Sequence, residues 1–253
     1  MRTNGHHSNI RTLQHSIPFS MQVRSEVDRL KLVYSEYAER GWGITKWSDS
    51  NRGNQAMREE CDRKLKQLLQ RAEFFPLDQR RMLDVGCGTG ETLAGFAKWG
   101  AKPENLFGVD LLADRIRRAK DSLAGINFQQ ANAEALPFTN GFFDLAAVFT
   151  VFTSILDPQM TRNISREINR VLRSGGLVAW YDFRINNPRN AHVRGISRKE
   201  ICNLFPGFDA RLISTTLIPP LARSFGVLTN VLYPCLASLP FLRSHYLGLL
   251  VKP

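Results

Sequence analysis

Blocks of apolar residues alternate with amphipathic stretches along most of the chain. Short apolar runs predict strands, and residues recurring every three to four positions predict helices. The run Phe142–Phe149 is almost wholly apolar, as expected for a strand buried on both faces. Strands that alternate with helices predict an α/β fold with a largely parallel sheet. The strands are expected at 82–85, 106–110, 126–131, 142–149, 177–183, 208–218 and 245–251, and the main helices at 91–99, 112–123 and 158–172.

Two amphipathic segments precede the first strand. Val23, Val27, Leu30, Tyr34 and Tyr37 fall on one helical face, which ends at Gly41. A second helix is predicted from Asn54, as its cap, to Ala72, with its inward positions at Met57, Cys61, Leu65 and Leu68. We therefore expect a helical cap over residues 22–75 and a main domain over residues 76–253. Residues 1–21 are polar and rich in histidine, and they predict a disordered tail.

An uncharged stretch, Ser224–Leu242, lies near the end of the chain. Its length would allow a membrane span, but Gly226, Asn230, Pro234 and Pro240 argue against one. We interpret residues 220–243 as an apolar helical insert between strands six and seven. Two interpretations stay open: a lid packed on the sheet, or a hydrophobic wall for a lipid-linked substrate that also rests on a bilayer. The apolar positions of this insert are Leu221, Phe225, Leu228, Leu232, Leu236 and Leu239.

Charge and cysteine content indicate which partners and which cellular compartment to expect. The net charge is +11, which favours anionic partners such as phospholipid headgroups, diphosphate-linked glycans or nucleic acid. The arginines are dispersed and no nucleic-acid-binding module accompanies them, so nucleic acid is the weaker expectation. Four cysteines without a C-x-x-C pair indicate a reduced compartment and no metal site. With no apolar signal segment, we expect a cytoplasmic protein that can associate with a membrane.

A glycine-rich turn follows the first strand in the segment LDVGCGTGE. Glycines in such a turn allow positive φ and close approach of a ligand to the backbone. The spacing is G-x-G-x-G, and Glu91 stands where a dinucleotide-binding loop has its third glycine. A carboxylate there opposes a pyrophosphate and suits a cationic amino acid. Asp84 is placed to hold an ammonium group, and Asp110, at the end of the second strand, is placed to hold ribose hydroxyls.

Three motifs follow one another in register: LDVGCGTG with GVD, then NAEALPF, then VLRSGG. Together they resemble the class I S-adenosylmethionine-dependent methyltransferases, in particular the small-molecule enzymes of ubiquinone and menaquinone biosynthesis. Asn132 stands where that family often has Asp, and Ser174 replaces a proline. The resemblance implies a Rossmann-like seven-stranded sheet in the order 3-2-1-4-5-7-6, with strand seven antiparallel, helices on both faces and an N-terminal helical lid.

The resemblance also implies that S-adenosyl-L-methionine is the cofactor. The adenine amino group is expected at Asn132. The full set of expected cofactor-binding residues is Asp84, Gly86, Cys87, Gly88, Gly90, Asp110, Leu111, Asn132, Ala133, Glu134 and Phe149.

The implied reaction is attack of an acceptor on the methyl group of the sulfonium. Asp182 and His192 lie at and beyond the end of strand five, on the ligand-binding side of such sheets, and are the candidate bases. Tyr34 is the candidate for orienting the acceptor. Tyr34, Tyr37, Trp42 and Trp47 either line the substrate pocket or pack the lid against the core.

The predicted function is therefore methylation of a small-molecule, glycan or lipid-precursor acceptor, most simply at a hydroxyl oxygen. One alternative is an RNA methyltransferase, although the segment after strand four, Thr150–Ile155, lacks the Asn/Asp-Pro-Pro-aromatic motif of base N-methylating enzymes. The other is a non-catalytic partner subunit that binds the cofactor. The acceptor, the methylated atom and the oligomeric state are left open by the sequence.

Overall fold

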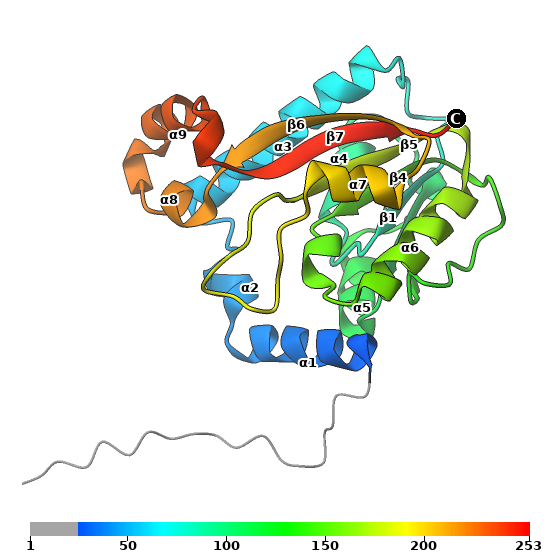
Figure 1. Cartoon of the computed structure of the whole chain (residues 1–253), viewed down its shortest axis with the longest axis horizontal. Coiled ribbons are helices and arrows are strands. Elements are labelled where there is room, and N and C mark those ends of the chain that lie inside the picture. Colours follow the sequence, from blue (N-terminus) through cyan, green and yellow to red (C-terminus); the bar gives the residue numbers. More distant parts are fainter. Residues whose placement is uncertain (1–24) are drawn as a thin grey trace, which may run out of the picture.

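The structure of the protein is a computed structural model that describes residues 25–253 (Figure 1). The tail predicted over residues 1–21 lies outside the described residues.

A seven-stranded sheet runs through the molecule in the order β3-β2-β1-β4-β5-β7-β6. The first five strands are parallel, and β7 is antiparallel to both β5 and β6. The predicted fold and strand order are confirmed. The strands are β1 (Met82–Val85), β2 (Leu106–Asp110), β3 (Asn127–Gln130), β4 (Phe143–Phe149), β5 (Leu172–Phe183), β6 (Asp209–Leu217) and β7 (Arg243–Val251).

Helices cover both faces of the sheet, each with its own buried cluster. On one face α3 (Arg52–Arg71), α4 (Glu91–Lys98) and α5 (Ala113–Ser122) pack, and on the other α6 (Pro158–Val171) and α7 (Arg198–Leu204). The first cluster includes Leu65, Leu93 and Ile116, and the second includes Ile164 and Ile201. Helix α6 begins where predicted, because the Asp157 side chain caps it and Pro158 stands at its first position. Short 3-10 turns are η1 (Pro103–Asn105) and η2 (Phe152–Ser154).

The start of α3 corrects one prediction. Asn51, not Asn54, is the cap, and its Oδ1 accepts from the backbone N–H groups of Gly53 (2.9 Å) and Asn54 (3.2 Å). Asn54 is buried one turn inside, and its amide donates to the Lys46 and Ser48 carbonyls at 3.1 and 2.9 Å. Met57, Cys61 and Leu65 face inward as predicted; Leu69 is the next buried position, and Leu68 is only partly buried against the same cluster. The preceding loop contains a short helix, α2 (Trp42–Thr45).

Helix α1 (Glu26–Glu39) lies across the carboxyl ends of the central strands (Figure 1). Its Arg29 donates to the carbonyl of Ser154, and its Tyr34 hydroxyl lies 2.9 Å from the Ser154 Oγ. The backbone N–H of Leu156 donates to the Glu26 carboxylate at 2.6 Å. The predicted N-terminal lid is therefore bound to the segment that follows β4.

The insert between β6 and β7 consists of α8 (Pro219–Arg223), η3 (Gly226–Leu228), α9 (Thr229–Ala237) and η4 (Pro240–Leu242). It lies at one end of β6 and β7 and packs on α3 (Figure 1). A Cβ on Gly53 would lie 2.1 Å from the Ala222 carbonyl oxygen, so only glycine allows this approach. The Tyr233 hydroxyl donates to the buried Glu60 carboxylate at 2.6 Å. No helix within residues 25–253 is long and apolar enough to cross a membrane.

Candidate functional site

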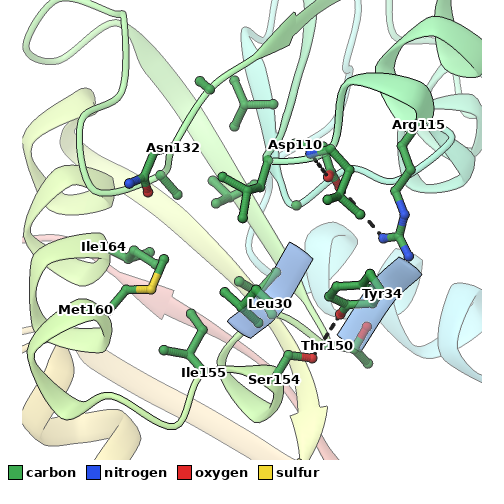
Figure 2. A pocket seen from close by; sticks show the side chains of 18 of the residues that line it. Leu30, Tyr34, Asp110, Arg115, Asn132, Thr150, Ser154, Ile155, Met160 and Ile164 are labelled. Carbon is green, nitrogen blue, oxygen red and sulfur yellow. Dashed lines mark hydrogen bonds and ion pairs between the residues drawn. The ribbon is translucent and has the colours of Figure 1, made fainter. Parts of the chain in front are cut away.

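A cavity of about 120 Å³ opens at the carboxyl ends of β1, β2 and β4 (Figure 2). Asn132, Met160 and Ile164 lie on one side of it, Tyr34 and Arg115 lie on the other, and Leu30 lies between them (Figure 2). Leu30 and Tyr34 come from α1, so the lid forms one wall. The remaining lining residues are Val85, Gly86, Val109, Asp110, Leu111, Leu112, Ala131, Ala133, Phe149, Thr150, Val151, Ser154 and Ile155.

The glycine turn has the backbone conformation that its sequence predicts. Gly86, Gly88 and Gly90 have φ values of 72°, 56° and 92°, in the left-handed region. A Cβ on Gly86 would lie 2.7 Å from the Val151 Cγ2 atom, so a side chain there would also collide with the segment after β4. The N–H groups of Gly86 and Cys87 both donate to the Val109 carbonyl, at 2.8 and 2.9 Å. These contacts tie the turn to the end of β2.

Asp110 is fixed in place by the same turn. Its Oδ2 accepts from the Gly88 N–H and its Oδ1 from the Leu112 N–H, both at 2.9 Å. The Arg115 guanidinium lies 3.9 Å from Oδ2, and the carboxylate is 5% exposed. A carboxylate held rigidly by charge-assisted bonds at the end of the second strand can accept from vicinal hydroxyls without reorganising.

Three carboxyl groups make this corner of a basic protein acidic. Burial raises the pKa of Asp84 well above its usual value, and the nearby charges of Asp110 and Glu91 raise it further. A cationic ligand beside these groups would relieve their repulsion, whereas an anionic pyrophosphate would add to it. S-adenosylmethionine carries a sulfonium and an ammonium group, so the residues present fit this cofactor.

The segment after β3 is held against α6 by side-chain contacts. Arg170 donates to the carbonyls of Leu136 (2.9 Å) and Phe138 (2.7 Å). Within the segment, the Asn132 Oδ1 accepts from the Glu134 N–H at 3.0 Å and keeps a second lone pair. Asn132 and Ala133 are thereby presented to the cavity, and the contact of Asn132 with the adenine stays a prediction.

The structure brings only part of the predicted set to the cavity wall. One group of predicted residues lines the cavity, a second lies outside the lining but within the glycine turn, β1 or the segment after β3, and a third lies outside the lining on β5 and the loop that follows it. The first group is Tyr34, Gly86, Asp110, Leu111, Asn132, Ala133 and Phe149; the second is Asp84, Cys87, Gly88, Gly90 and Glu134; the third is Asp182 and His192.

Asp182 is buried beneath η2 and does not reach the cavity. Its Oδ2 accepts from the Thr153 N–H at 3.0 Å and its Oδ1 from the Phe183 N–H at 2.8 Å. Burial raises the pKa of this carboxyl to about 7, against the lowering effect of the backbone donors and Arg194. That pKa suits a base, but a base must first reach the proton that it takes, and Asp182 is 1% exposed.

The Asp182 carboxyl predicts a pH dependence of stability. Because its folded pKa (about 7) exceeds its ordinary value of 3.8, the folded state binds the extra proton and the free energy of unfolding falls as pH rises between these values. The fall attributable to this group is up to ~4 kcal/mol. Denaturant unfolding from pH 4 to pH 7 measures it. Asp182→Asn should reduce the dependence of the unfolding free energy on pH, and the control Asp157→Asn should not. Equal pH dependence in the wild type and both variants would contradict the raised pKa of Asp182.

His192 lies on the exposed loop between β5 and α7. Its backbone N–H donates to the Asn190 Oδ1 at 3.1 Å, and the Asn190 amide donates to the Tyr37 hydroxyl at 3.0 Å. Tyr37 in turn stacks on Trp42 with ring centroids 4.6 Å apart. Tyr37 and Trp42 therefore join the lid to this loop and do not line the cavity, and neither does Trp47.

Tyr34 combines the cavity wall with the lid contact. Its ring lies under the Arg115 guanidinium, 4.4 Å from the ring centroid, and its hydroxyl meets Ser154. Burial raises the pKa of this phenol, so it stays protonated at neutral pH and can donate a hydrogen bond.

Several lining residues were not singled out from the sequence. Arg115 was indistinguishable from the other arginines of its helix, and Ser154 and Thr150 followed β4 without a recognisable motif. Met160 and Ile164 could have been found, because they lie one turn apart on the inward face of α6.

The sheet has the strand order of the class I S-adenosylmethionine-binding methyltransferase fold. The G-x-G-x-G turn, the rigidly held Asp110 at the end of β2 and the group of carboxyl groups that suits a cationic ligand agree with this fold. Residues 82–176 match the family model described as "Methyltransferase domain". Solved structures agree on the fold: S-adenosylmethionine-dependent methyltransferases from Archaeoglobus fulgidus and Mesorhizobium loti superpose with TM-scores of 0.54 and 0.56 at 16% identity. They cover 76% and 75% of this chain, and 94% and 96% of their own.

Curated relatives also match part of the chain. A fatty-acid O-methyltransferase of Mycolicibacterium smegmatis is 36% identical over 110 residues, 43% of this chain and 39% of its own. A phthiotriol/phenolphthiotriol dimycocerosates methyltransferase of Mycobacterium leprae is 32% identical over 135 residues (49% and 48%). A ubiquinone/menaquinone biosynthesis C-methyltransferase of Pectobacterium atrosepticum is 31% identical over 110 residues (41% and 43%). The matched stretch spans less than half the length of each of these relatives.

Residues 82–176 thus match a methyltransferase domain, the fold is shared with S-adenosylmethionine-dependent methyltransferases, and S-adenosylmethionine is the cofactor.

Proposed function

We propose that the protein transfers a methyl group from S-adenosylmethionine to a hydroxyl oxygen of a small, largely apolar acceptor of the lipid-precursor class. The observation that carries the proposal is the apolar wall of the cavity, opposite the acidic corner. This wall is formed by the apolar side chains of Leu30, Ile155, Met160 and Ile164, and only a few polar groups lie beside them. The names of two relatives, a fatty-acid O-methyltransferase and a phthiotriol/phenolphthiotriol dimycocerosates methyltransferase, support the same acceptor class. Because such acceptors partition into bilayers, the proposal includes peripheral contact with a membrane.

The chain's own residues act mainly by binding and alignment. When bound, the cofactor supplies an electrophilic methyl group on a sulfonium, whose departure as a neutral thioether needs no acid. Asp110 and the glycine turn hold the cofactor's polar ends, and the apolar wall holds the acceptor in line, which is where most of the rate acceleration in such a transfer arises. Tyr34 is the residue that we place at the acceptor, where its hydroxyl donates a hydrogen bond. The acceptor hydroxyl loses its proton in the transfer; Asp182 and His192 stay the candidate bases, and because both lie outside the cavity lining they would take this proton through water.

A nucleic-acid acceptor is not favoured by the cavity. Single-stranded nucleic acid binds in basic grooves with aromatic stacking platforms. Among the described residues that line this cavity, the one cation is Arg115, which already faces Asp110 and covers Tyr34.

Transfer of labelled methyl groups tests the proposal. Protein incubated with methyl-labelled cofactor should transfer label to free fatty acids or to the solvent-extractable fraction of a cell extract, and Tyr34→Phe should transfer less than Tyr37→Phe. Label recovered in RNA would overturn the acceptor class. Tight cofactor binding by calorimetry with no labelled product in any fraction would instead identify a non-catalytic subunit.

A further inference from the structure

The exposed side chains of the insert are mostly apolar, and none is charged. Val227, Val231 and Phe241 are 76%, 65% and 73% exposed, and Leu228 and Leu239 are also exposed. These five residues are called the insert patch. No residue from Ser224 to Leu242 carries a charge. Exposed helical faces of soluble proteins are normally charged or polar, and contiguous exposed apolar surface marks an interaction site.

Packing of the insert does not require these residues. Its inward side chains, Tyr233 and Ala237, are buried against Met57 and Leu217, and Tyr233 is bonded to Glu60. Glu60 also accepts from Lys64 at 2.6 Å, and Lys64 donates to Thr215 at 3.0 Å. The insert is thus anchored on α3 and β6 from within, and no residue from 25 to 253 covers the insert patch.

Cations without carboxylate partners surround the base of the insert. Arg184 donates to the carbonyls of Pro240 and Arg243, Arg243 donates to those of Ala237 and Ser238, and Arg223 donates to Asn54. Within residues 25–253, neither these three arginines nor Lys46 forms an ion pair. After Asp209 the chain has no further acidic residue.

Arg223 lies close to a second cation and to an exposed aromatic ring. Its Nη2 is buried and has no hydrogen-bond partner within residues 25–253. Burial lowers the pKa of Lys46, and the nearby charge of Arg223 lowers it further. The exposed Trp47 ring lies 4.1 Å from the guanidinium carbon of Arg223. Cations that lack carboxylate partners, an exposed tryptophan and an apolar tip are the combination found on proteins that rest in the headgroup layer of membranes.

We propose that the insert docks the protein on an anionic phospholipid bilayer, with the insert patch among the upper acyl chains and the positive charges of Lys46, Arg184, Arg223 and Arg243 on the side of the lipid phosphates. Charge complementarity favours an anionic bilayer over a second copy of the chain as the partner of the insert patch. A two-fold contact between insert patches would bring the two sets of unpaired cations into one small interface, where they repel.

The insert lies at the same edge of the sheet as the cofactor cavity. The insert lies where β6 ends and β7 begins, and β7 pairs there with the end of β5, through Phe183 and His245 (Figure 1). This is the edge of the sheet at which the parallel strands end and the cofactor cavity opens. A bilayer on the insert therefore lies on the side from which an apolar acceptor reaches the cavity. This last step rests on the proposed function, whereas the docking itself does not.

Sedimentation with vesicles tests the docking. The wild-type protein should bind phosphatidylcholine vesicles that contain phosphatidylglycerol, and added salt or vesicles of phosphatidylcholine alone should weaken the binding. Val231→Asp combined with Phe241→Asp should lower the vesicle partition coefficient about a hundredfold, because two apolar side chains no longer enter the acyl layer. Lys46→Gln should lower it about fivefold.

Matched controls keep the test specific. Ile213→Asp changes an exposed apolar residue of β6 outside the insert, and Arg211→Gln removes an exposed cation that is paired with Asp209, so both should bind vesicles like the wild type. Cofactor affinity by calorimetry should be the same for all variants, so that loss of docking is distinct from failure of the methyltransferase proposal. Equal binding by wild type and the Asp double variant, or a wild-type dimer that this variant dissociates, would overturn the proposal.

Discussion

Asp110→Ala is expected to lower the affinity for S-adenosylmethionine at least ~100-fold, since each hydrogen bond from a ribose hydroxyl to a buried carboxylate contributes about 1.5–3 kcal/mol. The substitution also removes the acceptor for the Gly88 and Leu112 N–H groups, which loosens the glycine turn. Isothermal titration calorimetry measures the loss.

The control for this variant is Asp114→Ala, which removes an exposed aspartate of the same helix region that pairs only weakly with Arg118 at 3.9 Å. Its affinity should equal that of the wild type. Thermal unfolding of both variants shows whether the fold survives. Unchanged affinity of a folded Asp110→Ala protein would remove the assignment of the ribose site.

Gly86→Ala is expected to weaken both the fold and the cofactor site. The alanine would adopt a φ of 72°, which costs about 1–2 kcal/mol for an L-residue, and its Cβ would lie 2.7 Å from Val151. The turn or the segment after β4 must move to relieve that contact, and both line the cavity. We expect a drop in melting temperature together with a loss of cofactor affinity of at least ~10-fold, which corresponds to a 1.4 kcal/mol change in binding free energy.

Gly175→Ala separates the two causes. Gly175 has nearly the same φ, 71°, but a Cβ there would meet no atom within 4 Å, and it lies near the start of β5, whereas the cavity opens where the parallel strands end. This variant should carry the conformational cost without the collision and without any change in cofactor affinity. If Gly86→Ala binds the cofactor as tightly as Gly175→Ala does, the contact with Val151 does not shape the site.

The parts of the fold that the sequence predicted well are those set by local chemistry. The apolar run of β4, the Asp157–Pro158 start of α6 and the glycine turn each follow from residues within a few positions of one another. The capping residue of α3 cannot be predicted from local chemistry alone. Asn51 and Asn54 are equally good caps by sequence, and the choice depends on the Lys46 and Ser48 carbonyls, which need the Asn54 amide inside the helix.

The candidate site divides in the same way. Residues contributed by the glycine turn and by the ends of β2 and β4, such as Gly86, Asp110 and Phe149, are brought to the cavity as their strands predict. Asp182 sits at a strand end of the same edge, yet its carboxylate turns to the N–H of Thr153, which is 29 positions away. Which side of a strand end faces the cavity depends on such long-range pairing, and no local pattern encodes it.

The position of α1 has a kinetic consequence. Leu30 and Tyr34 close the cavity from above, and three polar contacts to residues 154–156 hold the helix there. This helix is therefore part of the cavity wall, and its place there depends on those contacts. We therefore expect movement of α1, as in other enzymes with lids, to contribute to the rate at which the cofactor is exchanged.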